Sequence, residues 1–176
     1  MIYSQYLEHL RNKLIQKNLT ISVCETFTAG TFMHMLTKGM KNPSEILKYS
    51  CVGFSNKFKI NTMKVNKNTI RRHGPHSIEC AKEIAYNLKQ NTNSNISICF
   101  IGNPFPINQD DKYNNQFGII RIQQTIPKTC YAVVVFPDNK SSSFEINFTQ
   151  YWGFNIADSI REQASEFIAK QILNYL

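Results

Sequence analysis

The sequence predicts an α/β fold, a single-domain three-layer α/β/α sandwich with a mixed β-sheet that spans residues 1–176. Up to residue 101, short apolar runs rich in β-branched residues alternate with amphipathic helical patterns. Three strand patterns then follow one another before a last helical pattern, which indicates a sheet that is not purely parallel. A length of 176 residues and a hydrophobic fraction of 42% suit one domain with a substantial core.

Hydrophobic spacing divides the first part of the chain into helices and strands. Leu7, Leu10 and Leu14 recur at helical spacing, and Gly39 is placed to end the second helix. Ser55 and Ser77 precede helical patterns as N-caps. We expect helices over 4–17, 27–38 and 78–90, a short helix after Ser55, a helical turn over 68–72, and strands over 19–23, 49–54 and 96–101.

The second part of the chain begins with a polar stretch over 102–116, which is long for a loop in a compact domain. Strands are expected over 117–122 and 131–136, and the nearly all-apolar 131–136 favours an interior position. Apolar and polar residues alternate over 144–148, which predicts an edge or half-buried strand. A last helix is expected over 156–175.

Composition limits the classes of partner. The net charge is +8, but the lysines are scattered and Arg71-Arg72 is the one tight basic cluster, so the pattern argues against nucleic acid binding. The five cysteines form no CxxC pair and are odd in number, which is typical of reduced thiols in a cytoplasmic protein. No apolar run is long enough for a membrane span, and Glu8 and Arg11 interrupt any secretion signal.

The stretch VCETFTAGTF, residues 23–32, is a predicted strand-to-helix turn that contains Glu25, Thr26, Thr28 and Gly30. Such turns often carry nucleophiles or phosphate sites in α/β proteins. From the residues alone, Thr26 is either a nucleophile or a helix cap. His73 and His76 have H-x-x-H spacing, but Gly74-Pro75 between them breaks a helix, so we expect no metal site.

Six short stretches match, in order, the motifs of one known family. They are 25–30 against E-S-C-T-G-G, 54–59 against Y-S-N-x-x-K, 70–77 against L-x-x-H-G-A-V-S, 101–106 against [ST]-G-x-A-G-P, 117–120 against V-G-T-V, and 160–164 against I-R-x-x-[AT]. The chain therefore resembles the C-terminal domain of the CinA competence/damage-inducible proteins, a family that includes stand-alone nicotinamide mononucleotide deamidases. Larger members carry a further N-terminal domain, for which we expect this chain to have no room.

The resemblance implies an amidohydrolase that converts nicotinamide mononucleotide and water to nicotinic acid mononucleotide and ammonia, without a cofactor or metal. By motif position, it implies Thr26 as nucleophile, Lys59 as base and Asn56 beside it, one helical turn earlier. It also implies that backbone N–H groups at the helix start hold an oxyanion or phosphate. The implied substrate-binding residues are Glu25, Thr28, Gly30, Gly102 and Arg161. Arg161 is either a phosphate contact or a surface charge.

Several motif positions depart from the family pattern. Thr26 replaces serine, Ala29 replaces glycine, Phe54 replaces tyrosine and Ile101 replaces a hydroxyl residue, while Pro104-Phe105 replaces A-G. Two hypotheses follow: a nicotinamide-nucleotide amidohydrolase with a diverged active site, or a non-catalytic homologue that acts as a nucleotide-binding or interaction module. A nucleic-acid partner is a third and weaker hypothesis, and a homo-oligomer is compatible with the sequence.

Overall fold

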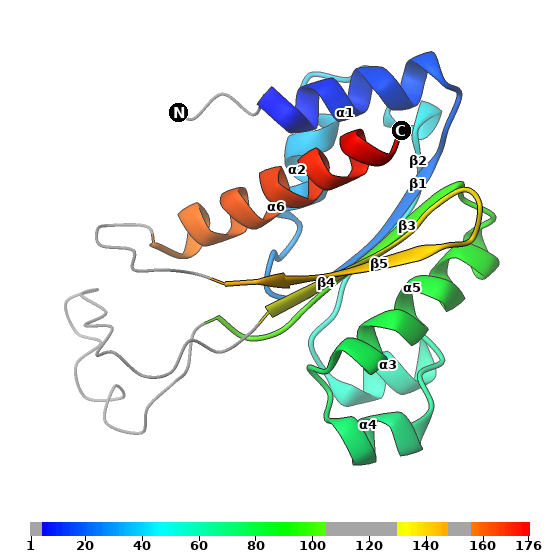
Figure 1. Cartoon of the computed structure of the whole chain (residues 1–176), viewed down its shortest axis with the longest axis vertical. Helices are drawn as coiled ribbons and strands as arrows, with labels where there is room; N and C mark the ends of the chain where they lie inside the picture. The colour runs from blue at the N-terminus through cyan, green and yellow to red at the C-terminus, as the bar shows by residue number, and fades with distance from the viewer. Residues whose placement is uncertain (1–4, 105–129, 148–155) are drawn as a thin grey trace.

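The computed structural model describes residues 5–104, 130–147 and 156–176, and these residues form a mixed β-sheet between two helical layers (Figure 1). The predicted strand over 117–122 and the motif residues Phe105 and Pro106 lie outside the described residues. The helices are α1 (Gln5–Gln16), α2 (Thr31–Thr37), α3 (Asn56–Asn61), α4 (Lys67–His73), α5 (Ile78–Thr92) and α6 (Ile156–Tyr175), with a short 3₁₀ helix η1 (Pro43–Glu45). The strands are β1 (Ile21–Glu25), β2 (Leu47–Val52), β3 (Ile96–Ile101), β4 (Cys130–Val135) and β5 (Ser141–Ile146).

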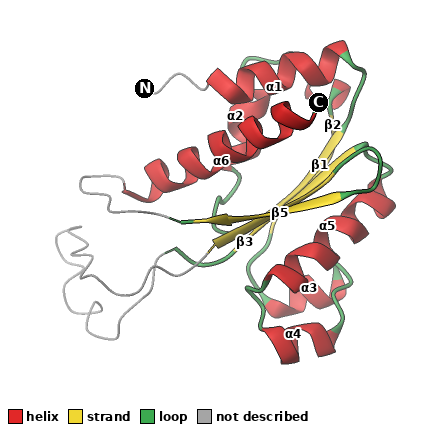
Figure 2. Ribbon diagram, in the orientation of Figure 1, coloured by secondary structure: helices red, strands yellow, loops and turns green. Residues whose placement is uncertain are grey.

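The sheet has the strand order β2-β1-β3-β4-β5 (Figure 2). β1 pairs in parallel with both β2 and β3, whereas β4 is antiparallel to β3 and to β5. The predicted mixed sheet is thereby confirmed. β4 lies between two strands, as its continuous apolar pattern predicts, and β5 lies at an edge of the described sheet, as its alternation predicts.

The two faces of the sheet carry separate cores. Alternate side chains of each strand point to opposite faces: Val23 and Ile98 face the layer of α1, α2 and α6, while Cys24 and Cys99 face α5. Figure 1 shows α1, α2 and α6 on one side of the sheet and α3, α4 and α5 on the other. The three-layer α/β/α architecture predicted from the sequence is confirmed.

Element boundaries near the turn differ from the sequence prediction. The first strand begins at Ile21 and not at Leu19, because the Leu19 N–H donates to the Leu14 carbonyl and closes the end of α1. The same strand continues to Glu25. The second helix begins only at Thr31, since Ala29 (φ 52°) and Gly30 (φ 92°) are both in the left-handed region and cannot continue an α-helix backward. Residues 26–30 are therefore a tight turn.

Candidate active site

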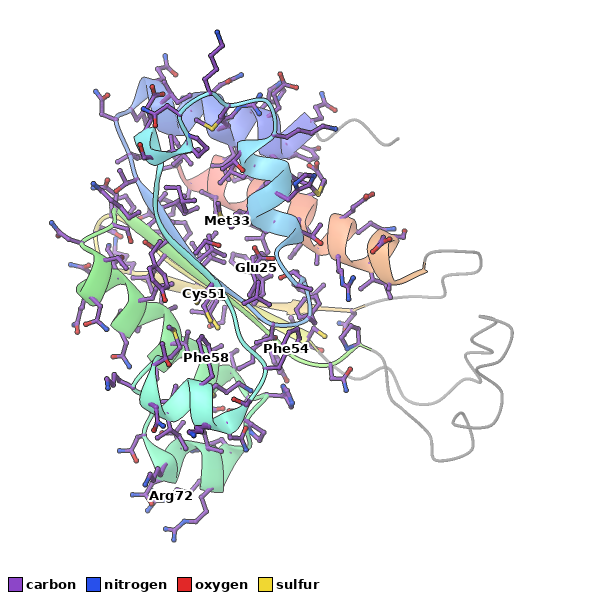
Figure 3. The ribbon with its side chains drawn as sticks, turned by 180° about the vertical axis from the view of Figure 1, so that it is seen from behind. Glu25, Met33, Cys51, Phe54, Phe58 and Arg72 are labelled. Atoms are coloured by element: carbon purple, nitrogen blue, oxygen red, sulfur yellow. The ribbon has the colours of Figure 1, made fainter. Side chains whose placement is uncertain are left out.

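Glu25 organises the turn between β1 and α2. Its side chain is fully buried, and its carboxylate accepts hydrogen bonds from the backbone N–H groups of Gly30 (3.0 Å), Phe32 (3.2 Å) and Met33 (3.1 Å). Figure 3 shows Glu25 near the start of α2, where Met33 lies. An α-helix leaves its first N–H groups without partners, and Gly30 offers no side-chain cap, so the Glu25 carboxylate takes that role.

Electrostatically, burial raises the pKa of Glu25, and the three backbone N–H donors oppose this shift. The Thr28 hydroxyl is also fully buried and also lowers this pKa, although no hydrogen bond of normal geometry joins it to the carboxylate. The N–H groups at the helix start that could hold a phosphate or oxyanion are thus already bonded, those of Gly30, Phe32 and Met33 to Glu25 and that of Thr31 to the Thr28 carbonyl. An anion could bind there only by displacing this carboxylate.

The motif resemblance predicts Thr26 as the nucleophile. Thr26 is 1% exposed, and its hydroxyl donates a hydrogen bond of 3.0 Å to the backbone carbonyl of Phe100 in β3. The Thr26 backbone N–H donates to the same carbonyl over 3.1 Å. A hydroxyl has one proton to donate, and in this structure that proton holds the end of β1 against β3.

The motif resemblance predicts Lys59 as the base. Lys59 lies in α3, is fully buried, and donates through Nζ to the backbone carbonyl of Pro75 over 2.7 Å. Burial lowers the pKa of this lysine, and the nearby thiols of Cys80, Cys99 and Cys24 oppose the shift. A lowered pKa makes the neutral amine, which is the form that a general base requires, easier to reach.

Asn56 and Lys59 lie on the same short helix but in different surroundings. The Ser55 side chain caps α3 by accepting from the Phe58 N–H over 3.1 Å, as predicted. Asn56 is exposed at the first turn of that helix, whereas Lys59 is buried. Among the described residues, no hydrogen bond joins Thr26 to Lys59 or Asn56 to either of them.

Gly102 follows β3 at a point of close backbone approach. It has a φ of +137°, and a Cβ placed on it would lie 2.7 Å from the Cys130 sulfur and 2.8 Å from the Cys130 Cα. No other residue type fits there without moving the backbone of β4. The structure thus gives Gly102 a role in joining β3 to β4, and its predicted contact with a substrate stays a prediction.

Arg161 approaches the turn from α6. Its Nε donates to the Phe27 carbonyl over 3.1 Å, and its Nη1 lies 3.4 Å from the Asp158 carboxylate. Sequence reasoning missed Asp158, although its spacing of three residues from Arg161 on a helix is a usable signal. The main-chain carbonyls of Phe27, Phe100 and Pro75 were also missed, and no residue type marks them in a sequence.

A groove of about 340 Å³ lies between α2 and α6, beside the turn. It is lined by Ala29, Gly30, Thr31, His34, Met35, Asp158 and Glu162. This volume is within the range of small-ligand sites. Gly30 is the one predicted substrate-binding residue in its lining.

Within the described ranges, no three His, Cys, Asp or Glu side chains gather as metal ligands. None of the described helices is long and apolar enough to cross a membrane.

Comparison with known proteins decides the family. A family model described as the CinA C-terminal domain matches residues 4–148. The chain belongs to the CinA C-terminal domain family. Competence-damage inducible proteins of Listeria innocua and Bacillus subtilis are 39% identical over 89 residues and 38% identical over 87 residues. Each match covers about half of this chain (51% and 49%) and 21% of the relative, so the chain spans about a fifth of the length of these CinA relatives.

Solved CinA structures share the fold over nearly the whole chain. The competence or damage-inducible protein of Enterobacter asburiae has a TM-score of 0.78 at 20% identity, with 99% of this chain and 98% of that chain covered. The competence/damage inducible protein CihA of Agrobacterium tumefaciens has a TM-score of 0.73 at 17% identity. That match covers 96% of this chain and 94% of that chain. At such identities the likeness concerns the CinA fold alone.

Proposed function

We propose that this chain is a CinA-type amidohydrolase of nicotinamide nucleotides with a diverged active site, in which Thr26 is the nucleophile and Lys59 the base. One observation carries the proposal: Lys59 stands at the position of the family's lysine, is fully buried, and has its pKa lowered by that burial. A lysine can accept a proton only when it is neutral, and desolvation favours the neutral amine.

In the proposed reaction, the Thr26 oxygen forms a bond to the carboxamide carbon of the substrate while the Lys59 amine takes the hydroxyl proton. The C–N bond then breaks, and Lys59 returns the proton to the departing nitrogen, which leaves as ammonia. Water hydrolyses the resulting ester, which releases the carboxylic acid and restores the Thr26 hydroxyl.

Two features of the turn make this reaction slow. The Thr26 hydroxyl must first give up its hydrogen bond to the Phe100 carbonyl, at a cost of about 0.5–1.5 kcal/mol. Its branched Cβ also restricts the rotation that would aim the oxygen at a substrate. We therefore expect a lower turnover than that of family members with serine at this position.

A non-catalytic role is the second candidate, and the bonding of both residues favours it. Thr26 and Lys59 each donate to a backbone carbonyl, of Phe100 and Pro75 respectively, so each has a structural use that needs no substrate. In that case the fold serves as a nucleotide-binding or interaction module. This non-catalytic role predicts that the chain binds nicotinamide mononucleotide without releasing ammonia.

The deciding experiment incubates the purified protein with nicotinamide mononucleotide and measures ammonia together with nicotinic acid mononucleotide. We expect the natural chain to release ammonia slowly, and the Thr26→Ala and Lys59→Met variants to release none. Lys67→Met, which changes an exposed lysine of α4, is the matched control and keeps the natural rate. Absence of product from the natural chain, or a Thr26→Ala variant of full activity, rejects the amidohydrolase. Saturable binding in calorimetry without product then selects the non-catalytic role.

A further inference from the structure

One segment of the chain holds nearly all of its net positive charge. Residues 46–78 contain seven lysine or arginine residues and neither aspartate nor glutamate. The whole chain has 20 lysine and arginine residues and 12 aspartate and glutamate residues, so the two signs nearly balance outside this segment. The scatter of lysines along the whole sequence, which argues against a nucleic-acid partner, hides this separation of charge. The segment includes α3 and α4 (Figure 1).

Helix α4 has an inner side that lies against α5. The Glu83 carboxylate of α5 accepts hydrogen bonds from the Asn66 N–H over 2.7 Å and from the Thr69 hydroxyl. Ile70 packs against the hydrophobic core on the same side of the sheet. Because side chains three and four residues apart share a face of a helix, positions 66, 69, 70 and 73 form the inner side of α4.

The outer side of α4 carries a stripe of positive charge. It consists of Lys67, Asn68, Arg71 and Arg72, and all four residues are exposed. Lys67 and Arg71 are about one helical turn apart, as are Asn68 and Arg72. Lys64 is also exposed, in the turn that leads into the helix. Lys64, Lys67, Arg71 and Arg72 are called the α4 stripe below, and Figure 3 shows Arg72 at the end of the molecule opposite α1.

The charge of the α4 stripe is not neutralised by the described part of the chain. The ion pairs found there join other groups. Glu83 is bonded to the inner side of α4, and Glu79 lies 3.9 Å from His73, which is also on the inner side. Within the described ranges, the stripe is therefore left to mobile ions from solvent, which a polyanion displaces when it binds.

The surroundings of the α4 stripe distinguish between kinds of polyanion. A membrane surface is bound by basic residues together with exposed apolar side chains. A nucleic acid single strand is bound largely by aromatic side chains on which its bases stack. Among the described residues, none of the exposed large hydrophobic or aromatic side chains belongs to α3 or α4. The stripe is thus suited to a partner that offers phosphates alone, as the backbone of a duplex does.

We propose that the α4 stripe binds the phosphate backbone of double-stranded nucleic acid without preference for sequence. Arg71 and Arg72 donate hydrogen bonds to phosphate oxygens, because a planar guanidinium matches two oxygens at once. Lys64 and Lys67 add positive charge, and the Asn68 amide donates to the same backbone. This binding is separate from the proposed hydrolysis, since neither Thr26 nor Lys59 belongs to the stripe.

The test measures how tightly the natural chain binds a short fluorescent DNA duplex, by anisotropy, between about 50 and 200 mM salt. Each neutralised phosphate contributes about −0.9 to the slope of log K against log salt concentration, so we expect a slope of about −3 to −4. Two duplexes of unrelated sequence should bind equally well. The same measurement with duplex RNA distinguishes the two sources of this backbone, and binding of either duplex supports the proposal.

A pair of double variants separates the α4 stripe from the overall charge of the chain. Arg71→Gln with Arg72→Gln should weaken binding at least about tenfold at low salt and reduce the magnitude of the slope by about 2. The matched control is Lys38→Gln with Lys41→Gln, which removes the same net charge from exposed positions after α2. Helix α2 lies on the other side of the sheet from α4 (Figure 1), so this control should bind as the natural chain does.

Four results overturn the proposal. They are the absence of saturable binding of either duplex by the natural chain at low salt, an equal loss of affinity in both double variants, tighter binding of a single strand than of the duplex, and binding of phosphatidylserine vesicles without binding of a duplex. Circular dichroism checks that each variant is folded, which we expect because all four substituted residues are exposed.

Discussion

The Thr26 hydroxyl donates its proton to the backbone carbonyl of Phe100 over 3.0 Å, and the Thr26 N–H donates to the same oxygen. This pair of bonds ties the end of β1 to β3 at the start of the turn. The side chain that the motif resemblance predicts as the nucleophile therefore stabilises the fold. Any catalytic use of Thr26 competes with that bond.

Replacing Thr26 with valine should lower the free energy of unfolding by about 1 kcal/mol, because valine keeps the shape and loses one buried hydrogen bond. Urea unfolding measures the change. Thr62→Val, at an exposed position with a similar side chain, is the control and should change stability by less than about 0.5 kcal/mol. Equal stability of the natural chain and Thr26→Val contradicts the structural role.

Removal of the Glu25 carboxylate should destabilise the protein more strongly. Glu25→Ala leaves the N–H groups of Gly30, Phe32 and Met33 without their acceptor inside the protein, at an expected cost on the order of 3 kcal/mol. Glu25→Gln keeps one acceptor oxygen and should cost less. Thermal unfolding by circular dichroism ranks the two variants, and the reverse order is incompatible with the capping role.

Lys59 should make stability depend on pH. Its pKa is lowered in the folded protein from the usual 10.5, so the unfolded chain binds more protons between the two values. The free energy of unfolding of the natural chain, relative to Lys59→Met, should therefore rise as pH rises through that window. Urea unfolding at a series of alkaline pH values measures this difference in the free energy of unfolding, with Lys67→Met as the control. A constant difference across the series argues against a lowered pKa.

Gly102 should be intolerant of a side chain for a packing reason. In Gly102→Ala the new Cβ meets the Cys130 sulfur at 2.7 Å and the Cys130 Cα at 2.8 Å, so β3 and β4 must separate. We expect a loss of at least about 2 kcal/mol. Gly39→Ala is the matched control, since Gly39 also has a positive φ (+79°) but no atom within 4 Å of the new Cβ. Its cost should be limited to backbone strain of about 1 kcal/mol, and equal losses in both variants remove the packing argument.

Hydrophobic periodicity predicted the elements that are long or fully buried. The strand over 96–101 is found as predicted, and the last helix over 156–175 likewise, because each has one uninterrupted pattern. The turn over residues 26–30, between β1 and α2, was predicted less well. Ala29 takes a left-handed conformation that its residue type disfavours, so local propensity placed the start of α2 four residues too early.

The sequence by itself determined the family, the order of the described elements and the mixed sheet, because these depend on motif order and on the spacing of apolar residues along the chain. The tertiary structure alone decided which atoms the motif residues contact. Thr26 bonds to Phe100 and Lys59 to Pro75 through main-chain carbonyls, which every residue possesses and no sequence motif marks. Which carbonyl comes within reach depends on how strands and helices distant in the chain pack together.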